Sequence, residues 1–494
     1  MISQHPDHAG KPYWHDQEFI ATHHEAEECF LSFSELGSSE YKWDWEGKLV
    51  DESVIERLLM EHFEFFQKNP LGKEKFLTFR LPNPNVETEF RIGRAFMCLM
   101  SAAGLATKVG LHSPPMFEVI LPMTESAGEM IGVQEAFAEI SSLKHYLNKT
   151  YNGSLKYIEI IPLFEKVTTI ANSQNILQEY IKLHKKRFAK SPEYLRPYIA
   201  RSDPALNSGL VPTVLAVKIA LSHYRKFETT NGLKLYPIIG SASLPFRGGL
   251  TPLAVKDFVD EYRGVRTALL QSAFRYDFDK EKAIAGIQEL EALLPGLQAV
   301  EISDPEERKL TEAIFLFEKF YQGVIPGIAP IINEVASKLP RRRERVQHIG
   351  LFGYSRGVGG VKLPRAIGFC GALYSLGILP ELIGTGRGLR EASKRGLKEV
   401  VEKYYLNLKK DLVKSGRFLN KENLLKLSGK VSAWQEVRED VNYVEDYLGI
   451  ELGPETPEEV EHVRLTSKIY KLLEDQKEMI YELTCAALLR KSLG

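Results

Sequence analysis

Charged side chains recur at the ends of short apolar runs in this sequence. The set consists of five arginines and two carboxylates, namely Arg80, Arg247, Arg275, Arg356, Arg365, Glu165 and Asp203. Carboxylates without nearby Cys or His ligands are hard oxygen donors, which Mg²⁺ and Mn²⁺ prefer. Arginines present planar, permanently charged forks to phosphate and carboxylate groups. This chemistry predicts a positively charged site that binds a small polyanion, or two anions, beside a divalent ion.

A glycine pair follows one of these arginines. Gly248 and Gly249 come directly after Arg247 in the segment LPFRGGLTP. Glycines let a backbone approach a ligand closely, and the flanking N–H groups can hold an anion. Arg-Gly-Gly also occurs in ordinary turns, so the pair supports the site only together with the charged set.

The elements that must position these residues are eight short apolar runs, between most of which lie amphipathic segments. The runs are Phe76–Arg80, Phe117–Pro122, Tyr157–Pro162, Tyr198–Arg201, Leu235–Ser241, Thr267–Ala273, His348–Tyr354 and Leu363–Ile367. Most are continuously apolar, as expected for parallel strands covered by helices. The pattern predicts an α/β fold built on a (β/α)₈ TIM-type barrel, with extensive additional helices.

We predict a single domain over residues 1–494. Residues 1–75 are assigned to an N-terminal arm and helices, and residues 388–494 to a C-terminal helical region. Residues 76–387 are assigned to the barrel, with a helical insert at 274–347. In such a barrel the loops after the carboxyl ends of the strands carry the chemistry, so the charged set should share one rim.

The overall composition is balanced in charge and indicates no large charged surface outside the predicted site. The chain has 64 basic and 65 acidic residues, a balance that gives no indication of a nucleic-acid or membrane partner. Its four cysteines lie far apart and form no CxxC pair, which suits a reducing compartment. No apolar run reaches the roughly 18 residues of a membrane helix, and no signal-peptide pattern opens the chain. We expect a soluble cytoplasmic protein.

Three other motifs suggest different readings. GYSRG at 353–357 matches the G-x-S-x-G elbow of serine hydrolases with Ser355 as nucleophile, but the following glycines and Pro364 disfavour the required helix. The basic run PRRRER at 340–345 is expected on a solvated helix face or an interface. GTGRGL at 384–389 lacks the full dinucleotide-binding spacing and is expected to be a turn before a helix.

Taken in order, the segments resemble phosphoenolpyruvate carboxylase, most closely its short archaeal type. The segments that carry the resemblance are SQHPDH, YKWDWEGKLVD, FRLPNPNVE, PLFE, ARSDPALNSG, LPFRGGLTP, QSAFRYD and GYSRG. The resemblance runs nearly end to end, and the ordered set is far more specific than any one segment. It implies a barrel of the phosphoenolpyruvate/pyruvate class.

The resemblance also implies roles for single residues. His5 matches the catalytic histidine of the family, and Glu165 and Asp203 match its metal ligands. Arg247 and Arg356 are the further catalytic candidates. The substrate-binding candidates are Arg80, Arg275, Arg365, Gln271, Gly248 and Gly249. One departure is Leu206, which stands where longer family members have a lysine; Arg201 is the candidate replacement.

The implied reaction converts phosphoenolpyruvate and bicarbonate into oxaloacetate and phosphate through carboxyphosphate and an enolate. Mg²⁺, with Mn²⁺ as an alternative, is the implied cofactor, and a homotetramer is the implied assembly. His5 would act as base, with the first residues of the chain folded over the barrel mouth. The alternatives are another metal-dependent barrel lyase or phosphotransferase of the phosphoenolpyruvate/pyruvate type, a serine hydrolase using Ser355, and a helical interaction scaffold.

Overall fold

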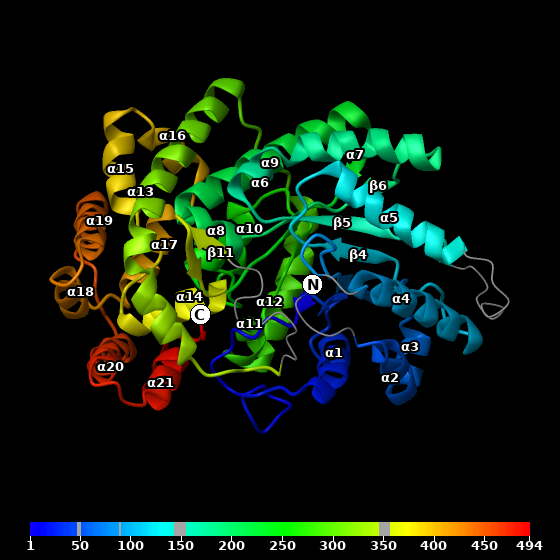
Figure 1. Ribbon diagram of the computed structural model, residues 1–494, viewed down its shortest axis with the longest axis horizontal. Coiled ribbons are helices and arrows are strands. Elements are labelled where there is room, and N and C mark those ends of the chain that lie inside the picture. The colour runs from blue at the N-terminus through cyan, green and yellow to red at the C-terminus, as the bar shows by residue number, and fades with distance from the viewer. Residues whose placement is uncertain (47–50, 88–89, 143–154, 345–355) are drawn as a thin grey trace.

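The barrel is an eight-stranded parallel sheet, which confirms the predicted fold class (Figure 1). The computed structural model describes residues 1–46, 51–87, 90–142, 155–344 and 356–494. The strands, in spatial order, are β1 (Ile2–Ser3), β2 (Glu40–Asp44), β3 (Phe76–Arg80), β4 (Glu118–Leu121), β5 (Glu159–Phe164), β7 (Tyr198–Ile199), β9 (Ile238–Ile239) and β10 (Thr267–Ala268).

The first and last strands of this order meet and close the barrel. The Ser3 N–H donates to the Leu270 carbonyl at 2.9 Å, and the Leu270 N–H donates to the Met1 carbonyl at 2.8 Å. Ile2 and Leu270 thereby form a parallel bridge. Ile2 and Ser3 are therefore part of the barrel wall, so at these two residues the expectation of an arm folded over the mouth is wrong.

Two barrel strands, β1 and β2, lie within the region that was predicted to hold only an arm and helices. Strand β1 is two residues long and carries no periodic signal. Strand β2 alternates, because Tyr41 and Trp43 pack into the core outside the barrel while Asp44 lies on the opposite, inner face and binds Arg80. A search for continuously apolar runs misses both patterns.

Six of the eight predicted strands are confirmed in position, with ends shifted by a few residues. The predicted strand His348–Tyr354 lies outside the described residues. The predicted strand Leu363–Ile367 is wrong. Strand β12 (Val361–Leu363) pairs antiparallel with β11 (Arg356–Val358) in a separate hairpin, and helix α14 (Ala366–Leu376) begins three residues later. Pro364 has no N–H to donate to a sheet, which explains why the strand stops there.

Side chains fill the barrel interior in layers. A middle layer is apolar and contains Ile120, Ile161, Leu163, Tyr198, Ala200, Ile238 and Leu269. At the amino end of the strands Arg196 bridges Glu40 and Glu118. At the carboxyl end Arg80 binds Asp44. The interior is therefore a packed core with an ionic cluster at each end, and the upper cluster is the floor of the candidate site.

Helices cover the outside of the barrel. Those around and between the strands are α1 (Glu25–Ser34), α2 (Val54–Glu61), α3 (Phe63–Lys68), α4 (Arg91–Lys108), α5 (Ala127–Ser142), α6 (Val167–Ala171), α7 (Ser173–Phe188), α8 (Ser202–Ser208), α9 (Leu210–Asn231), α10 (Val255–Glu261), α11 (Ser272–Tyr276) and α12 (Lys280–Leu293). Two short strands, β6 (Tyr194–Leu195) and β8 (Lys234–Leu235), pair beneath the barrel. None of the helices in the described ranges is both long and apolar enough to cross a membrane.

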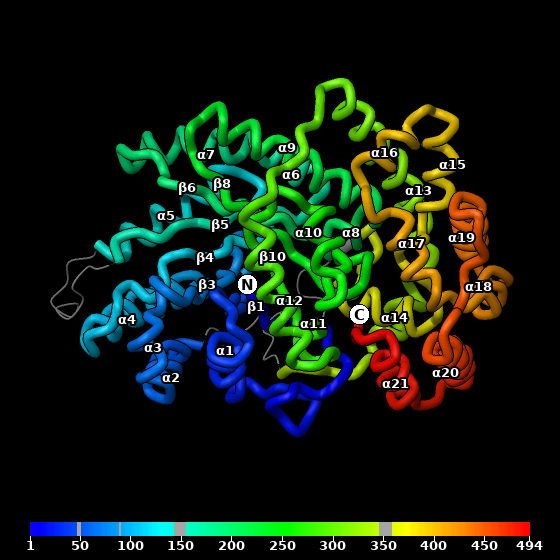
Figure 2. Tube along the Cα trace, turned by 180° about the vertical axis from the view of Figure 1, so that it is seen from behind, coloured from blue at the N-terminus to red at the C-terminus, as the bar shows by residue number. Residues whose placement is uncertain are grey.

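A second helical layer stands on one side of the barrel, away from α2 to α5 (Figures 1 and 2). Its central member is α13 (Asp304–Ser337), which packs against α9, α14, α15 and α19. The remaining helices are α15 (Thr385–Lys394), α16 (Lys398–Tyr404), α17 (Leu408–Gly416), α18 (Lys421–Ser428), α19 (Ser432–Leu448), α20 (Pro457–Glu474) and α21 (Ile480–Arg490). The GTGRGL glycines open α15, where a Cβ on Gly386 would lie 2.0 Å from the Asp440 carbonyl oxygen. They serve close helix packing.

Two arginines of the basic run PRRRER lie in an interface within the chain, the second of the two expectations from the sequence, and not on a solvated face. Arg342 is buried and donates to the Ala9 carbonyl at 2.9 Å. Arg343 is buried and pairs with Glu25 and Glu28 of helix α1. These arginines bind the N-terminal segment to the segment after α13.

Candidate active site

The carboxyl ends of the eight strands meet at one end of the barrel, and most candidate residues follow them. His5 follows β1, Arg80 ends β3, and Glu165 follows β5. Asp203 lies in the first turn of α8 after β7, and Arg247 lies in the short 3₁₀ helix Pro245–Arg247 after β9. Gln271 and Arg275 follow β10, and Arg365 precedes the first turn of α14. Arg356 begins β11, and its side chain lies outside the described part of the structure.

The two candidate metal ligands both affect the pKa of one buried tyrosine. Burial raises the pKa of Tyr198, Arg80 opposes this, and the carboxylates of Glu165, Asp44 and Asp203 raise it further. Glu165 is buried and accepts the Met123 N–H at 2.7 Å, which fixes its carboxylate at the strand end. Asp203 is half-buried. Both carboxylates therefore act electrostatically on Tyr198.

Arg80 is held by two carboxylates that the sequence analysis did not assign. Its Nε and Nη2 donate to the two oxygens of Asp44 at 2.7 and 2.6 Å, and its Nη1 pairs with Glu46. Glu46 also lies 3.6 Å from Arg365, whose side chain is 29% exposed. Asp44 and Glu46 both belong to the segment YKWDWEGK. An acidic pair at the end of an alternating strand was therefore the sequence signal that could have identified them as partners of Arg80.

Lys42 lies below this cluster on the same face of β2. It is 1% exposed, and its Nζ has no hydrogen-bond partner among the described residues. Burial, followed by repulsion from Arg80, lowers the pKa of Lys42 to about 7, although Asp44, Glu46 and Glu165 act to raise it. The floor of the site thus contains a lysine that is close to losing its proton at neutral pH.

Arg247 is turned into the protein. Its guanidinium is almost fully buried and donates to Ser202 Oγ at 3.1 Å, Gln271 Oε1 at 2.6 Å and Asp7 Oδ2 at 3.4 Å, and it also contacts the Gly494 carbonyl oxygen. The glycine pair supports this turn. Gly248 and Gly249 have φ of 121° and 73°, and their N–H groups donate to the carbonyls of Pro245 and Leu244. Both N–H groups therefore already have hydrogen-bond partners within the turn and are not directed at an anion.

His5 sits on a turn that is fastened to helix α11. Its Nδ1 lies 3.0 Å from Ser3 Oγ, and its carbonyl accepts the Ser272 hydroxyl at 2.8 Å. The neighbouring His8 is buried, and burial lowers its pKa to about 3. His5 is the partly exposed histidine of the two, so it keeps the access that a base requires.

Arg275 belongs to a different cluster. It is fully buried and binds the Ser3 carbonyl at 2.9 Å, the Tyr276 hydroxyl at 2.8 Å and Glu28 at 3.2 Å. Arg201, the suggested replacement for the missing lysine, donates to the Tyr262 hydroxyl at 3.0 Å. Three of the predicted site arginines, Arg80, Arg247 and Arg275, are therefore buried in ion pairs, so the mouth is less positive than the sequence suggested.

The sequence matches the phosphoenolpyruvate carboxylase family over residues 1–494. The chain belongs to the phosphoenolpyruvate carboxylase family. It is 38% identical to the phosphoenolpyruvate carboxylase of Leuconostoc mesenteroides, over 95% of this chain and 93% of that protein. It is 36% identical to the enzyme of Oenococcus oeni over 100% and 98%, and 37% identical to that of Metallosphaera sedula over 100% and 99%. The family's short archaeal type is the one that fits this chain.

Membership of the phosphoenolpyruvate carboxylase family leaves the serine-hydrolase alternative without support. Ser355 lies outside the described residues. His462, which follows it in the sequence, is buried in α20 against Phe418 and Arg490 of the C-terminal helices. Burial and Arg490 hold the pKa of His462 well below its usual range, so it is not set up as a base.

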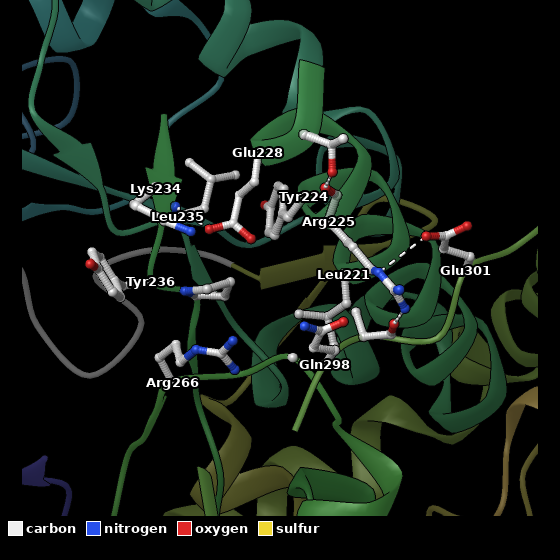
Figure 3. A pocket seen from close by; sticks show the side chains of 14 residues that line it. Leu221, Tyr224, Arg225, Glu228, Lys234, Leu235, Tyr236, Arg266, Gln298 and Glu301 are labelled. Atoms are coloured by element: carbon white, nitrogen blue, oxygen red, sulfur yellow. Dashed lines mark hydrogen bonds and ion pairs between the residues drawn. The ribbon is translucent and has the colours of Figure 1, made fainter. Parts of the chain in front are cut away.

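A cavity of about 530 Å³ lies beside the amino end of strand β9, away from the candidate residues that follow the strands (Figure 3). It is lined by α9, β8 and the segment before α13. Its polar groups bind one another: Arg225 pairs with Glu301 at 3.1 Å and donates to the Ala299 carbonyl at 2.7 Å, and Glu228 accepts the Leu235 N–H at 2.9 Å.

Proposed function

We propose that this protein carboxylates phosphoenolpyruvate with bicarbonate and releases oxaloacetate and phosphate. The observation that carries the proposal is the match to the phosphoenolpyruvate carboxylase family along the full chain. Carboxylates and arginines at the carboxyl ends of the strands support it, because this is where barrel enzymes carry out their chemistry.

Glu165 and Asp203 are the proposed ligands of Mg²⁺, with Mn²⁺ as the alternative. Magnesium binds proteins through one or two carboxylates and fills its remaining positions with water and substrate oxygens. Among the described residues no group of three or more His, Cys, Asp and Glu side chains is placed to hold a metal, and the proposed pair would rely on water and substrate oxygens for the remaining positions. The bound ion would neutralise negative charge on the substrate oxygens.

The arginines would stabilise charge on phosphate and carboxylate. Arg365 is the described candidate with an exposed guanidinium, and we propose that it contacts the phosphoryl group together with Arg356. Arg80 would act from below, by holding Asp44 and Glu46 in place, while Arg275 and Gln271 shape the wall. Bicarbonate oxygen attacks phosphorus, the enolate of pyruvate leaves, and carboxyphosphate remains.

His5 is the proposed base. Carboxyphosphate must lose its proton to break into CO₂ and phosphate, and a partly exposed imidazole is suited to accept a proton near neutral pH. The enolate carbon then attacks CO₂. Arg247, with Gly248 and Gly249 shaping its turn, would keep this side of the site closed, so that water does not protonate the enolate to pyruvate.

The competing function is a lyase or phosphotransferase of the phosphoenolpyruvate/pyruvate type that does not use bicarbonate. A malate-dehydrogenase-coupled assay with and without bicarbonate and Mg²⁺ separates the two. We expect oxaloacetate and phosphate in equal amounts, and neither product without bicarbonate. Phosphate release that persists unchanged in bicarbonate-free buffer would exclude a carboxylase. Arg225→Gln, at the cavity beside the amino end of β9, is the control variant and should keep full activity.

We also propose a homotetramer acting in the cytoplasm, as expected for this family. Light scattering of the purified protein tests the assembly: a mass near four times the chain's 56.0 kDa supports it, and a monomer contradicts it.

A further inference from the structure

Asp7 is a fully buried carboxylate that the proposed chemistry does not use. It lies two residues after His5, and its side chain has no exposed surface. Its own N–H donates to Ser272 Oγ at 2.9 Å. A buried carboxylate is costly unless charges and hydrogen bonds compensate it, so its partners define its role.

Three separate parts of the chain meet at this residue. Asp7 Oδ1 accepts the Ala273 N–H at 2.8 Å and the Ser272 hydroxyl at 3.2 Å, both in the first turn of α11. Asp7 Oδ2 lies 3.4 Å from Nη1 of Arg247, in the loop after β9. The Asp7 carbonyl accepts the Leu493 N–H at 2.7 Å.

The same turn sets the position of His5. Ser272 binds the His5 carbonyl through both its hydroxyl and its N–H, at 2.8 and 3.2 Å. One short segment therefore fixes His5 at one end and the Arg247 guanidinium at the other. Gln271, which also binds Arg247, directly precedes Ser272 and completes the connection.

We propose that Asp7 is a positioning residue for carboxylation, which holds the Arg247 guanidinium at a fixed place relative to His5. This inference rests on the proposed function, because it takes His5 as the base and Arg247 as part of the closed wall. Misplacement of a reacting group by about 1 Å can cost on the order of 100-fold in rate. The loss of rate should appear at the carboxylation step, in which the enolate must react with CO₂ before water protonates it.

The chain offers a matched control in Asp277. This carboxylate is also buried beside the N-terminal segment, where it accepts the Ala9 N–H at 2.8 Å and the Gly10 N–H at 2.7 Å. Like Asp7, Asp277 connects the N-terminal segment to the region of helix α11. Its hydrogen bonds go to Ala9 and Gly10, and not to Arg247 or to the turn that carries His5. A purely structural role for Asp7 predicts the same outcome for Asp7→Asn and Asp277→Asn.

The test measures phosphate, oxaloacetate and pyruvate together in wild type, Asp7→Asn and Asp277→Asn, alongside their melting temperatures. We expect Asp7→Asn to lower kcat for oxaloacetate by roughly 10- to 100-fold, with excess phosphate and pyruvate and a KM for phosphoenolpyruvate within about 3-fold of wild type. Asp277→Asn should keep equal amounts of oxaloacetate and phosphate.

Two further variants make the result decisive. In an Arg247→Gln background, Asp7→Asn should add no further loss, because the two residues act as one unit. If Asp7→Asn does not fold, Asp7→Glu, which keeps the charge but moves the carboxylate, is judged by the same product ratio. Wild-type kcat and product ratio in the folded Asp7 variant would overturn the inference. A wild-type protein without bicarbonate-dependent turnover would instead refute the proposed function.

Discussion

Replacing Lys42 by methionine should make the protein more stable, by an amount that shrinks as the pH rises. Lys42 has a pKa of about 7 in the folded chain, against an ordinary value of 10.5, because it is buried beneath Arg80. Between these values the unfolded chain binds more protons at this site than the folded chain does. The stability of the wild type therefore rises with pH across this window.

The size of the effect follows from the same two values. Each pH unit between pH 7 and pH 10.5 changes the unfolding free energy by up to about 1.4 kcal/mol. The penalty is fully present below pH 7, where Lys42 is charged in both states, and there it is about 5 kcal/mol. Methionine has a similar shape and carries no charge, so its advantage should be largest there and mostly gone near pH 10.

Melting temperatures of wild type and Lys42→Met, measured in EDTA from about pH 6 to about pH 9.5, provide the assay. Lys309→Met, on the exposed face of α13, is the matched control and should follow the wild-type curve. The curves of wild type and Lys42→Met should converge toward high pH. If they stay parallel over the whole range, the argument that Lys42 is a strained, buried cation is wrong.

Three other changes test the site. His5→Asn should preserve bicarbonate attack on phosphorus but lower oxaloacetate relative to phosphate by at least about 10-fold; an unchanged product ratio would remove His5 as the base. Glu165→Gln should weaken Mn²⁺ binding, followed by electron paramagnetic resonance, by about 10-fold or more, and equal binding to wild type would argue against a ligand role. Gly494→Ala should lower both kcat and melting temperature, because a Cβ there would lie 2.0 Å from the Ile367 carbonyl oxygen and 2.5 Å from the Gly371 nitrogen. Wild-type behaviour of that variant would show that the contact between Gly494 and Arg247 is dispensable.

Much of the fold could be predicted from the sequence because most barrel strands are continuously apolar. The six barrel strands β3, β4, β5, β7, β9 and β10 were located within a few residues. Strand β2 was missed because its inner face carries Lys42 and Asp44, which form an ionic floor in place of an apolar layer. Strand β1 was missed because two residues contain no period, and only their pairing with β2 and with Leu270 makes them a strand.

The candidate site was harder to predict than the fold, because the ion-pair partner of a charged residue depends on the folded structure and can be distant in sequence. Arg80 and Arg275 both follow strands, yet Arg80 binds Asp44 at the barrel mouth while Arg275 binds Glu28 of helix α1. Nothing in their local sequence separates these outcomes. Asp7 was missed for the same reason, since its partners Ala273 and Arg247 are distant along the chain.

The pairing of β1 with the region after β10 has a consequence for how the chain reaches this structure. Ser3 and Leu270 are 267 residues apart, so during synthesis β1 has no second neighbour until those 267 residues have been added. Contacts of such long range slow folding, and an unpaired strand edge invites aggregation in the meantime. Because the His5 carbonyl is bound by Ser272, fragments that end before β10 cannot assemble this part of the site.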